Sequence, residues 1–391
     1  MHPSHRVSSR LLLLLLLAAV LNGCGLFGGE EEEDPPAELV KFKPTLKIRQ
    51  VWSAGIGGGS KRLRLALQPA TDGSRVFAAA HDGKVAAFEA EKGKRLWSTK
   101  TKLPLSAGPA VSATLVVLGS SNGDVVALNT DNGAELWRVQ VSSEVLAAPA
   151  VNDELVFVRT VDGKLLALQA SDGSQAWFVQ QDVPRLSVRG TGSPVIAGNA
   201  VIAGFDNGHI SAYESGSGSV LWDILLNPPI GRTEIERLSD LNTTVTVVGD
   251  DLYVSAYQGS LSSLAQESGQ TLWSREVSSY NGAAADFINV YVSDQFSELH
   301  AMSRRSGREA WKVDILRQRD VTGPAVVGNS VVVADFEGYV HWFDASSGAL
   351  QARMKAGGKQ VTAAPLVVGN TVYVLNEAGK LYAFRERPAK K

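Results

Sequence analysis

The chain has 391 residues, of which 44% are hydrophobic, so it can form a large buried core. Its net charge at pH 7 is only −2 and its pI is near 6.3, so it presents no global basic field that would attract nucleic acid. The single cysteine, Cys24, excludes a disulfide framework and a cysteine-based metal site. Four of the six histidines, His81, His209, His300 and His341, lie in separate repeats, and we expect no metal site from them.

Residues 1–23 are typical of a secretory signal peptide, because two arginines precede an apolar run at 11–21 that is too short to span a bilayer. The run ends at Gly23-Cys24, which resembles the lipobox of bacterial lipoproteins, in which the cysteine is acylated and becomes the first mature residue. The alternative is an ordinary signal peptide with an incidental cysteine. Gly25 stands where inner-membrane lipoproteins carry an aspartate, so we expect a lipid anchor in the outer membrane, on its periplasmic side.

Residues 24–44 are expected to form an acidic, flexible tether. Five consecutive acidic residues at 30–34 precede two prolines, and such a segment buries little apolar surface. The predicted domain boundaries are therefore a signal peptide at 1–23, a tether at 24–44, a folded body at 45–387 and a short tail at 388–391.

Eight copies of one repeat fill the folded body. Their central glycine position is occupied by Gly83, Gly123, Gly163, Gly208, Gly259, Ser297, Gly338 and Gly379. Fourteen residues after the first six of these comes a tryptophan, and a second glycine stands four residues before each tryptophan position. A unit of about 40 residues is typical of a β-propeller blade.

Each repeat contains four short strand-like runs, which in the fourth repeat are 194–196, 200–204, 209–213 and 220–222. Turn dipeptides such as Asn207-Gly208 separate these runs. The eighth repeat lacks its last strand, and a spare tryptophan strand exists at 48–52. The sequence therefore predicts an all-β, eight-bladed propeller of four-stranded blades, closed by the N-terminal strand around Trp52. The repeats resemble the quinoprotein-type (PQQ-like) propeller repeat, and we expect the tryptophans to pack between blades.

Length variation is confined to the connections between one blade and the next. The two longest interior connections, 178–193 and 223–244, both flank the fourth blade, so we expect them to lie side by side. Apolar residues alternate in them with arginines and carboxylates, which suits a protein interface. Alternatively, Arg189 and Arg237 pair with nearby acidic residues and hold the loops together. The spacing alone leaves both interpretations open.

The lipobox, the acidic tether, the eight repeats and two loop segments together resemble the BamB family, the propeller lipoproteins of the outer-membrane β-barrel assembly (BAM) machinery. The loop segments are Pro184 to Gly190 and Ser239 to Thr244. The resemblance implies binding to the periplasmic POTRA domains of the barrel-forming subunit BamA. The family's partner-contacting positions correspond to Leu186, Val188, Arg189, Asp240 and Asn242. Val188 replaces the commoner leucine and keeps an apolar contact, whereas Asn242 replaces an aspartate and loses a charge.

Three alternatives accompany this interpretation. A PQQ-dependent dehydrogenase uses the same repeat, but such enzymes have adjacent cysteines and calcium-binding carboxylates, and neither pattern occurs here. We therefore expect no enzyme activity and no cofactor. A generic periplasmic interaction propeller with another partner is compatible with the composition. Direct contact with unfolded β-barrel clients through strand addition is a further mode, on which the sequence says little.

Overall fold

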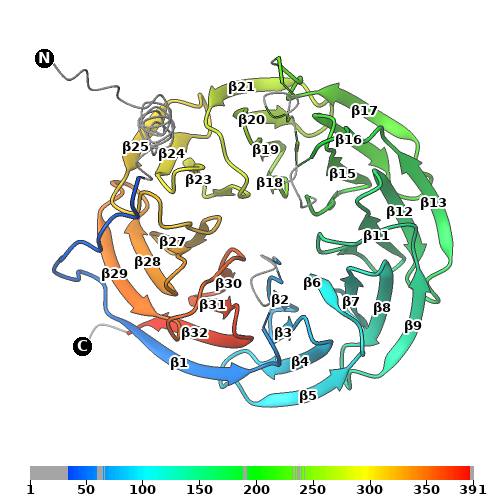
Figure 1. Cartoon of the computed structure of the whole chain (residues 1–391), viewed down its shortest axis with the longest axis horizontal. Helices are drawn as coiled ribbons and strands as arrows, with labels where there is room; N and C mark the ends of the chain where they lie inside the picture. The colour runs from blue at the N-terminus through cyan, green and yellow to red at the C-terminus, as the bar shows by residue number, and fades with distance from the viewer. Residues whose placement is uncertain are drawn as a thin grey trace, which may run out of the picture. The chain divides into compact units, whose positions relative to one another are not determined.

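The computed structural model describes residues 34–59, 65, 67–187, 192–230, 232, 233, 235, 238, 240, 241 and 243–387. These residues form thirty-two strands in eight four-stranded antiparallel sheets. The sheets stand around a ring as propeller blades, with the first strand of each blade towards the centre and the fourth outside (Figure 1). Among the described residues, no helix is long and apolar enough to cross a bilayer.

Blades 1 to 4 contain β2 (Ala70–Thr71), β3 (Arg75–Ala79), β4 (Lys84–Glu89), β5 (Arg95–Lys100); β6 (Leu105–Val111), β7 (Leu115–Ser120), β8 (Asp124–Asn129), β9 (Glu135–Gln140); β10 (Ala150–Val151), β11 (Leu155–Arg159), β12 (Lys164–Gln169), β13 (Gln175–Gln180); and β14 (Val195–Ala197), β15 (Ala200–Gly204), β16 (His209–Glu214), β17 (Val220–Leu225). Blades 5 to 8 contain β18 (Thr246–Val248), β19 (Asp251–Ser255), β20 (Ser260–Ala265), β21 (Thr271–Glu276); β22 (Ala284–Ala285), β23 (Asn289–Ser293), β24 (Leu299–Ser303), β25 (Glu309–Val313); β26 (Ala325–Val327), β27 (Ser330–Ala334), β28 (Tyr339–Asp344), β29 (Leu350–Lys355); and β30 (Leu366–Val368), β31 (Thr371–Asn376), β32 (Lys380–Glu386) with β1 (Ile48–Gly55).

The ring closes through the N-terminal strand, as predicted. β1 pairs antiparallel with β32, with Trp52 opposite Ala383, and so completes the sheet β1-β32-β31-β30. The first and last strands of the ring therefore share one blade, and every blade has four strands.

The tryptophan and glycine of the repeat meet across the blade boundary. Each tryptophan donates its indole N–H to a backbone carbonyl of the next blade, as Trp97 does to Thr130 at 2.8 Å and Trp273 to Arg304 at 2.7 Å. The glycine four residues before the next tryptophan position lies against the indole of the preceding blade. A Cβ added to Gly133 would stand 2.4 Å from the Trp97 side chain. That glycine also has φ +70°, a conformation which side chains disfavour. The predicted packing role of the tryptophans is confirmed.

Residues 37–46, part of the predicted tether, form a strap along the outside of blade 7. The amides of Thr45 and Leu46 donate to the carbonyl of Gln351 at 3.1 and 3.3 Å, and Arg353 donates to the carbonyl of Val40 at 3.1 Å. The amide of Ala37 donates to the carbonyl of Arg317 at 2.9 Å, and its carbonyl accepts a hydrogen bond from the Arg319 guanidinium at 3.0 Å.

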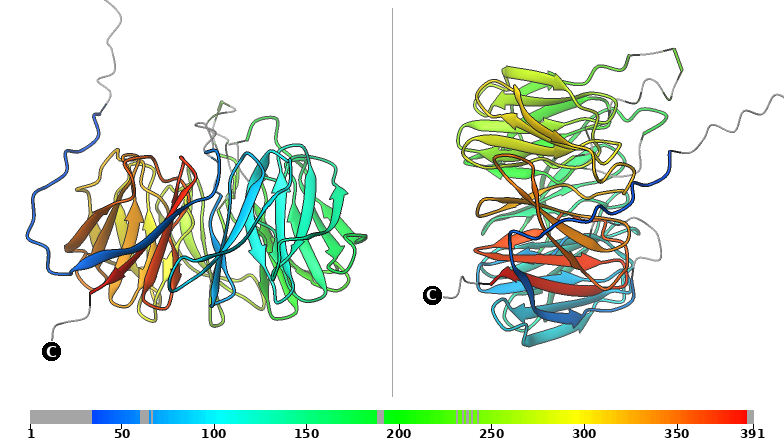
Figure 2. Two further views of the ribbon diagram at one scale, coloured as in Figure 1. Left: turned by 90° about the horizontal axis from the view of Figure 1, so that it is seen from below. Right: turned by 90° about the vertical axis from the view of Figure 1, so that its left-hand side faces the viewer.

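The strap ends on the face of the ring that carries the long inter-blade loops, and the blue segment in Figure 2 runs towards that face in both views. Leu39 and Leu46 pack against the cores between blades 6 and 7 and between blades 7 and 8. The compact body begins at Ala37, which differs from the sequence-based boundary at residue 45.

Candidate functional site

The two long loops at 181–194 and 226–245 join blade 4 to its neighbours on either side. Their ends touch, because a Cβ added to Gly192 would lie 2.5 Å from the carbonyl oxygen of Thr243 and 3.3 Å from that of Leu241. The expectation that these loops lie side by side is therefore confirmed. They stand on the face that points upward in the left view of Figure 2.

The end of the second loop is fixed to the body of the propeller. Leu241 is fully buried in the core of blades 4 and 5, and its amide donates to the carbonyl of Phe205 at 3.2 Å. Thr243 donates its hydroxyl to the carbonyl of Ser255 at 2.6 Å. Leu241 and Thr243 therefore attach the end of the second loop to blades 4 and 5.

The predicted partner-contacting residues have different environments. Leu186 is 44% exposed and available to a partner, whereas Asp240 is 2% exposed and interacts within the chain. For Asp240 this arrangement agrees with the alternative in which charged loop residues hold the loops together. Val188, Arg189 and Asn242 lie outside the described residues, and so does Cys24.

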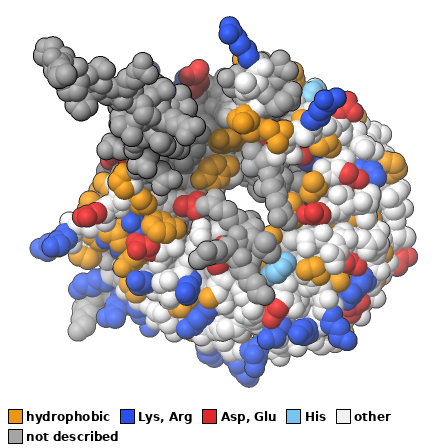
Figure 3. Space-filling view, viewed as in Figure 1, with side chains coloured by type: hydrophobic (Ala, Val, Ile, Leu, Met, Phe, Trp, Pro, Cys, Tyr) orange, Lys and Arg blue, Asp and Glu red, His pale blue; other side chains and the backbone are white. Residues whose placement is uncertain are grey.

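Sequence reasoning counted the apolar residues of the second loop towards an interface but did not single out two that are exposed. Ile230 is 76% exposed and Ile235 is 64% exposed. The sequence could have predicted their exposure, because both isoleucines lie in a long polar connection, where no alternating strand pattern would direct them into a core. Hydrophobic side chains are exposed among charged ones on this face of the ring (Figure 3), a mixture typical of protein interfaces.

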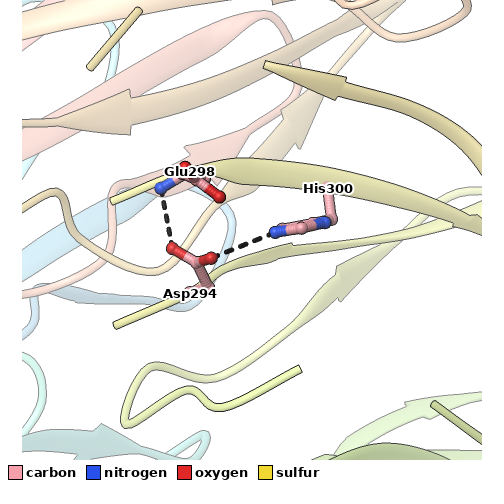
Figure 4. Close-up of side chains that lie close together, drawn as sticks. All are labelled: Asp294, Glu298 and His300. Carbon is pink, nitrogen blue, oxygen red and sulfur yellow. Dashed lines mark hydrogen bonds and ion pairs between the residues drawn. The ribbon is translucent and has the colours of Figure 1, made fainter. Parts of the chain in front are cut away.

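A cluster of Asp294, Glu298 and His300 in blade 6 has the residue types of a metal site (Figure 4). Its charges are already compensated, because Glu298 pairs with Lys312 at 2.5 Å and Arg317 at 2.9 Å, and His300 contacts Asp294 and Glu309 at 3.2 Å each. Although burial acts to raise the pKa of Asp294, hydrogen bonds from His300 and from backbone amides lower it below the ordinary value.

Blade 7 has a related arrangement, in which Asp335 contacts His341 at 3.2 Å and Arg319 at 2.9 Å. In both blades the aspartate accepts hydrogen bonds from amides of the turn between the second and third strands. The recurrence at equivalent positions indicates that these groups hold that turn rather than a ligand.

The fold and the candidate site define a propeller of eight quinoprotein-type blades with two adjoining long loops on one face. The family model described as "Outer membrane protein assembly factor BamB" matches residues 81–313 and 296–389. The chain is 47% identical to the assembly factor BamB of Pseudomonas aeruginosa, over 90% of this chain and 93% of that protein. It is 50% identical to that of Alkalilimnicola ehrlichii, over 86% and 88%. The chain belongs to the BamB family of outer membrane protein assembly factors.

Solved structures agree on the fold. The crystal structure of BamB from Moraxella catarrhalis matches with a TM-score of 0.79 at 26% identity, over 86% of this chain and 99% of that one. The quinohemoprotein alcohol dehydrogenase from Comamonas testosteroni matches with a TM-score of 0.68 at 13% identity, over 89% of this chain and 78% of that one. At that identity the dehydrogenase shares the fold alone.

Proposed function

We propose that this chain is a non-enzymatic lipoprotein subunit of the BAM complex which binds the periplasmic POTRA domains of BamA through the loops at 181–194 and 226–245. In this role it assists the folding and insertion of outer-membrane β-barrel proteins. Family membership supports the assembly role. The observation that carries the choice of surface is the contact between the ends of the two loops, at Gly192 and Thr243.

The loop surface has the composition that such binding needs. Leu186, Ile230 and Ile235 are exposed apolar side chains that bury their surface only when a partner covers them. Interfaces of this type depend on a few apolar anchors surrounded by polar contacts. Asp240, which is buried in the unbound chain, supports the loop from within and thereby keeps these anchors in place.

The test is a binding titration between residues 25–391, without the acyl group, and the purified periplasmic region of BamA. We expect Leu186→Asp and Arg189→Glu to weaken binding at least about ten-fold, because anchors at interface centres contribute 2 kcal/mol or more. Asp240→Asn should weaken binding less, since it removes a charge but not the side-chain volume.

Leu136→Asp is the matched control, because Leu136 is 50% exposed on β9 of blade 2, away from both loops. It should bind as the wild type does. Unchanged affinity in all three loop variants, with folding intact by circular dichroism, would assign the loops a structural role and place the interface elsewhere.

We also propose that Cys24 carries the lipid that anchors the chain to the periplasmic side of the outer membrane. The sequence around Cys24 supports this, as no other cysteine exists in the chain. Cys24→Ser should abolish labelling by palmitate and release the chain from the membrane fraction. Retention of both label and membrane association in the variant would contradict the assignment.

A further inference from the structure

Arg159 breaks the repeat at one position. It ends β11, four residues before the central glycine position of blade 3. The equivalent residue is small in six other blades and leucine in the seventh: Ala79, Gly119, Gly204, Ser255, Ser293, Ala334 and Leu375. The fold therefore does not require a long or charged side chain there.

The guanidinium of Arg159 is buried without hydrogen bonds. Its exposed fraction is 0%, and none of its three nitrogens has a hydrogen-bond partner within the described chain. The nearest carboxylate oxygen, Oδ1 of Asp206, lies 3.7 Å away and has no donor either. Burial lowers the pKa of Arg159 and raises that of Asp206, in each case against the attraction between them. Such a pair contributes little to stability, because its attraction does not offset the loss of hydration.

Arg159 contacts the turn at 205–207 of blade 4, and residues of this turn form hydrogen bonds with both long loops. Its guanidinium carbon lies 4.3 Å from the centre of the Phe205 ring. The carbonyl of Phe205 accepts the amide of Leu241 in the second loop. The side-chain amide of Asn207 donates to Gln181, where the first loop begins, at 3.4 Å.

We propose that Arg159 and Asp206 are positioning residues that set the two loops for partner binding. The guanidinium fixes the Phe205 ring by stacking on it, and Asp206 keeps the turn at 205–207 directed towards blade 3. Leu241 and Gln181 then follow the position of that turn. A charge pair at a position where the other blades have a small residue or leucine thus lies against the turn that is bonded to both loops. This inference rests on the proposed function.

The experiment compares the double variant Arg159→Met and Asp206→Asn with the wild type. Both substitutions keep side-chain volume and remove charge, so we expect the thermal unfolding midpoint to equal or exceed that of the wild type. Binding to the periplasmic region of BamA should weaken at least about ten-fold, because the turn at 205–207 would no longer hold the two loops in one arrangement relative to each other. Stability and binding therefore respond independently.

Arg304→Met is the matched control, because Arg304 holds the opposite face of the ring with hydrogen bonds to Tyr253, Asp286 and Val248. It should lower the unfolding midpoint and leave affinity unchanged. Wild-type affinity in the double variant, or a clear drop in its midpoint, overturns the inference. If the wild type itself does not bind, the proposed function fails, and amide exchange at Leu241 then decides: faster exchange in the double variant supports positioning, and equal exchange rejects it.

Discussion

Removing the indole of Trp52, on the strand that closes the ring, should destabilise the whole propeller. Trp52 on β1 is buried between blades 8 and 1. Its side chain makes tilted ring contacts with Phe88 and Tyr373, at 5.9 and 5.7 Å between centroids, and donates to the carbonyl of Ala90 at 3.0 Å. A buried tryptophan removes roughly 200 Å² from water, which at about 25 cal/mol per Å² corresponds to about 5 kcal/mol. The lost hydrogen bond adds about 1 kcal/mol, and partial collapse of the cavity returns part of the total.

We therefore expect Trp52→Ala to lower the free energy of unfolding by about 4 kcal/mol, measured by urea denaturation. Arg49→Ala is the control, since Arg49 is exposed on the same strand, and it should change stability by less than about 0.5 kcal/mol. Amide exchange should accelerate most in β1 and β32, where the ring is closed by pairing between the two ends of the chain. A loss below about 1 kcal/mol for Trp52→Ala would mean that β1 is not part of the cooperative fold.

Two further predictions concern stability. Gly307→Ala places a methyl group 2.6 Å from the Trp273 ring at φ +63°, so urea denaturation should show a loss of about 3 kcal/mol. Gly328→Ala meets nothing within 4 Å at φ +55° and should lose only about 1 kcal/mol; equal losses would show that the glycine–tryptophan contact is unimportant. The pKa of Asp294 is below its ordinary 3.8 in the folded state, so its contribution is fully present above that value and is lost as pH falls through the folded-state pKa. Asp294→Asn should therefore be less stable at pH 7 and lose less stability than the wild type on acidification below 3.8; parallel pH profiles would contradict this.

The fold could be predicted because the residues that recur in each repeat make the same contact in each blade. Glycine and tryptophan recur at fixed spacing since the indole of one blade packs on the glycine of the next, as Trp97 does on Gly133. Closure by β1 followed from a missing strand at one end and a spare one at the other. The position of the long loops followed from the topology, because all variation in length falls between blades.

Other features depend on contacts between residues far apart in the chain. The strap at 37–46 was predicted to be part of the tether because its sequence lacks the alternation of a strand. Its partners Arg319 and Arg353 lie 282 and 313 residues later in the chain. The burial of Asp240 depends on how the loop folds back on blade 4, which spacing does not encode. Arg159 could have been noticed, since small residues occupy its position in six other blades, but its lack of hydrogen bonds is visible only in three dimensions.

The hydrogen bonds of the strap should resist a pulling force applied to the N-terminal side of the chain. A pull on the chain from its N-terminal side first loads the bonds of Ala37 to Arg317 and Arg319, then the contact of Val40 with Arg353, and then the bonds of residues 45 and 46 to Gln351. These bonds lie on the connection between blades 6 and 7 and along β29 of blade 7, ahead of Ile48, where β1 begins. Without them the same force would peel β1 from β32 one residue at a time, beginning at the seam of the ring. Force applied from that side is thereby carried first by the bonds of the strap to the outer strand of blade 7 and to the preceding connection.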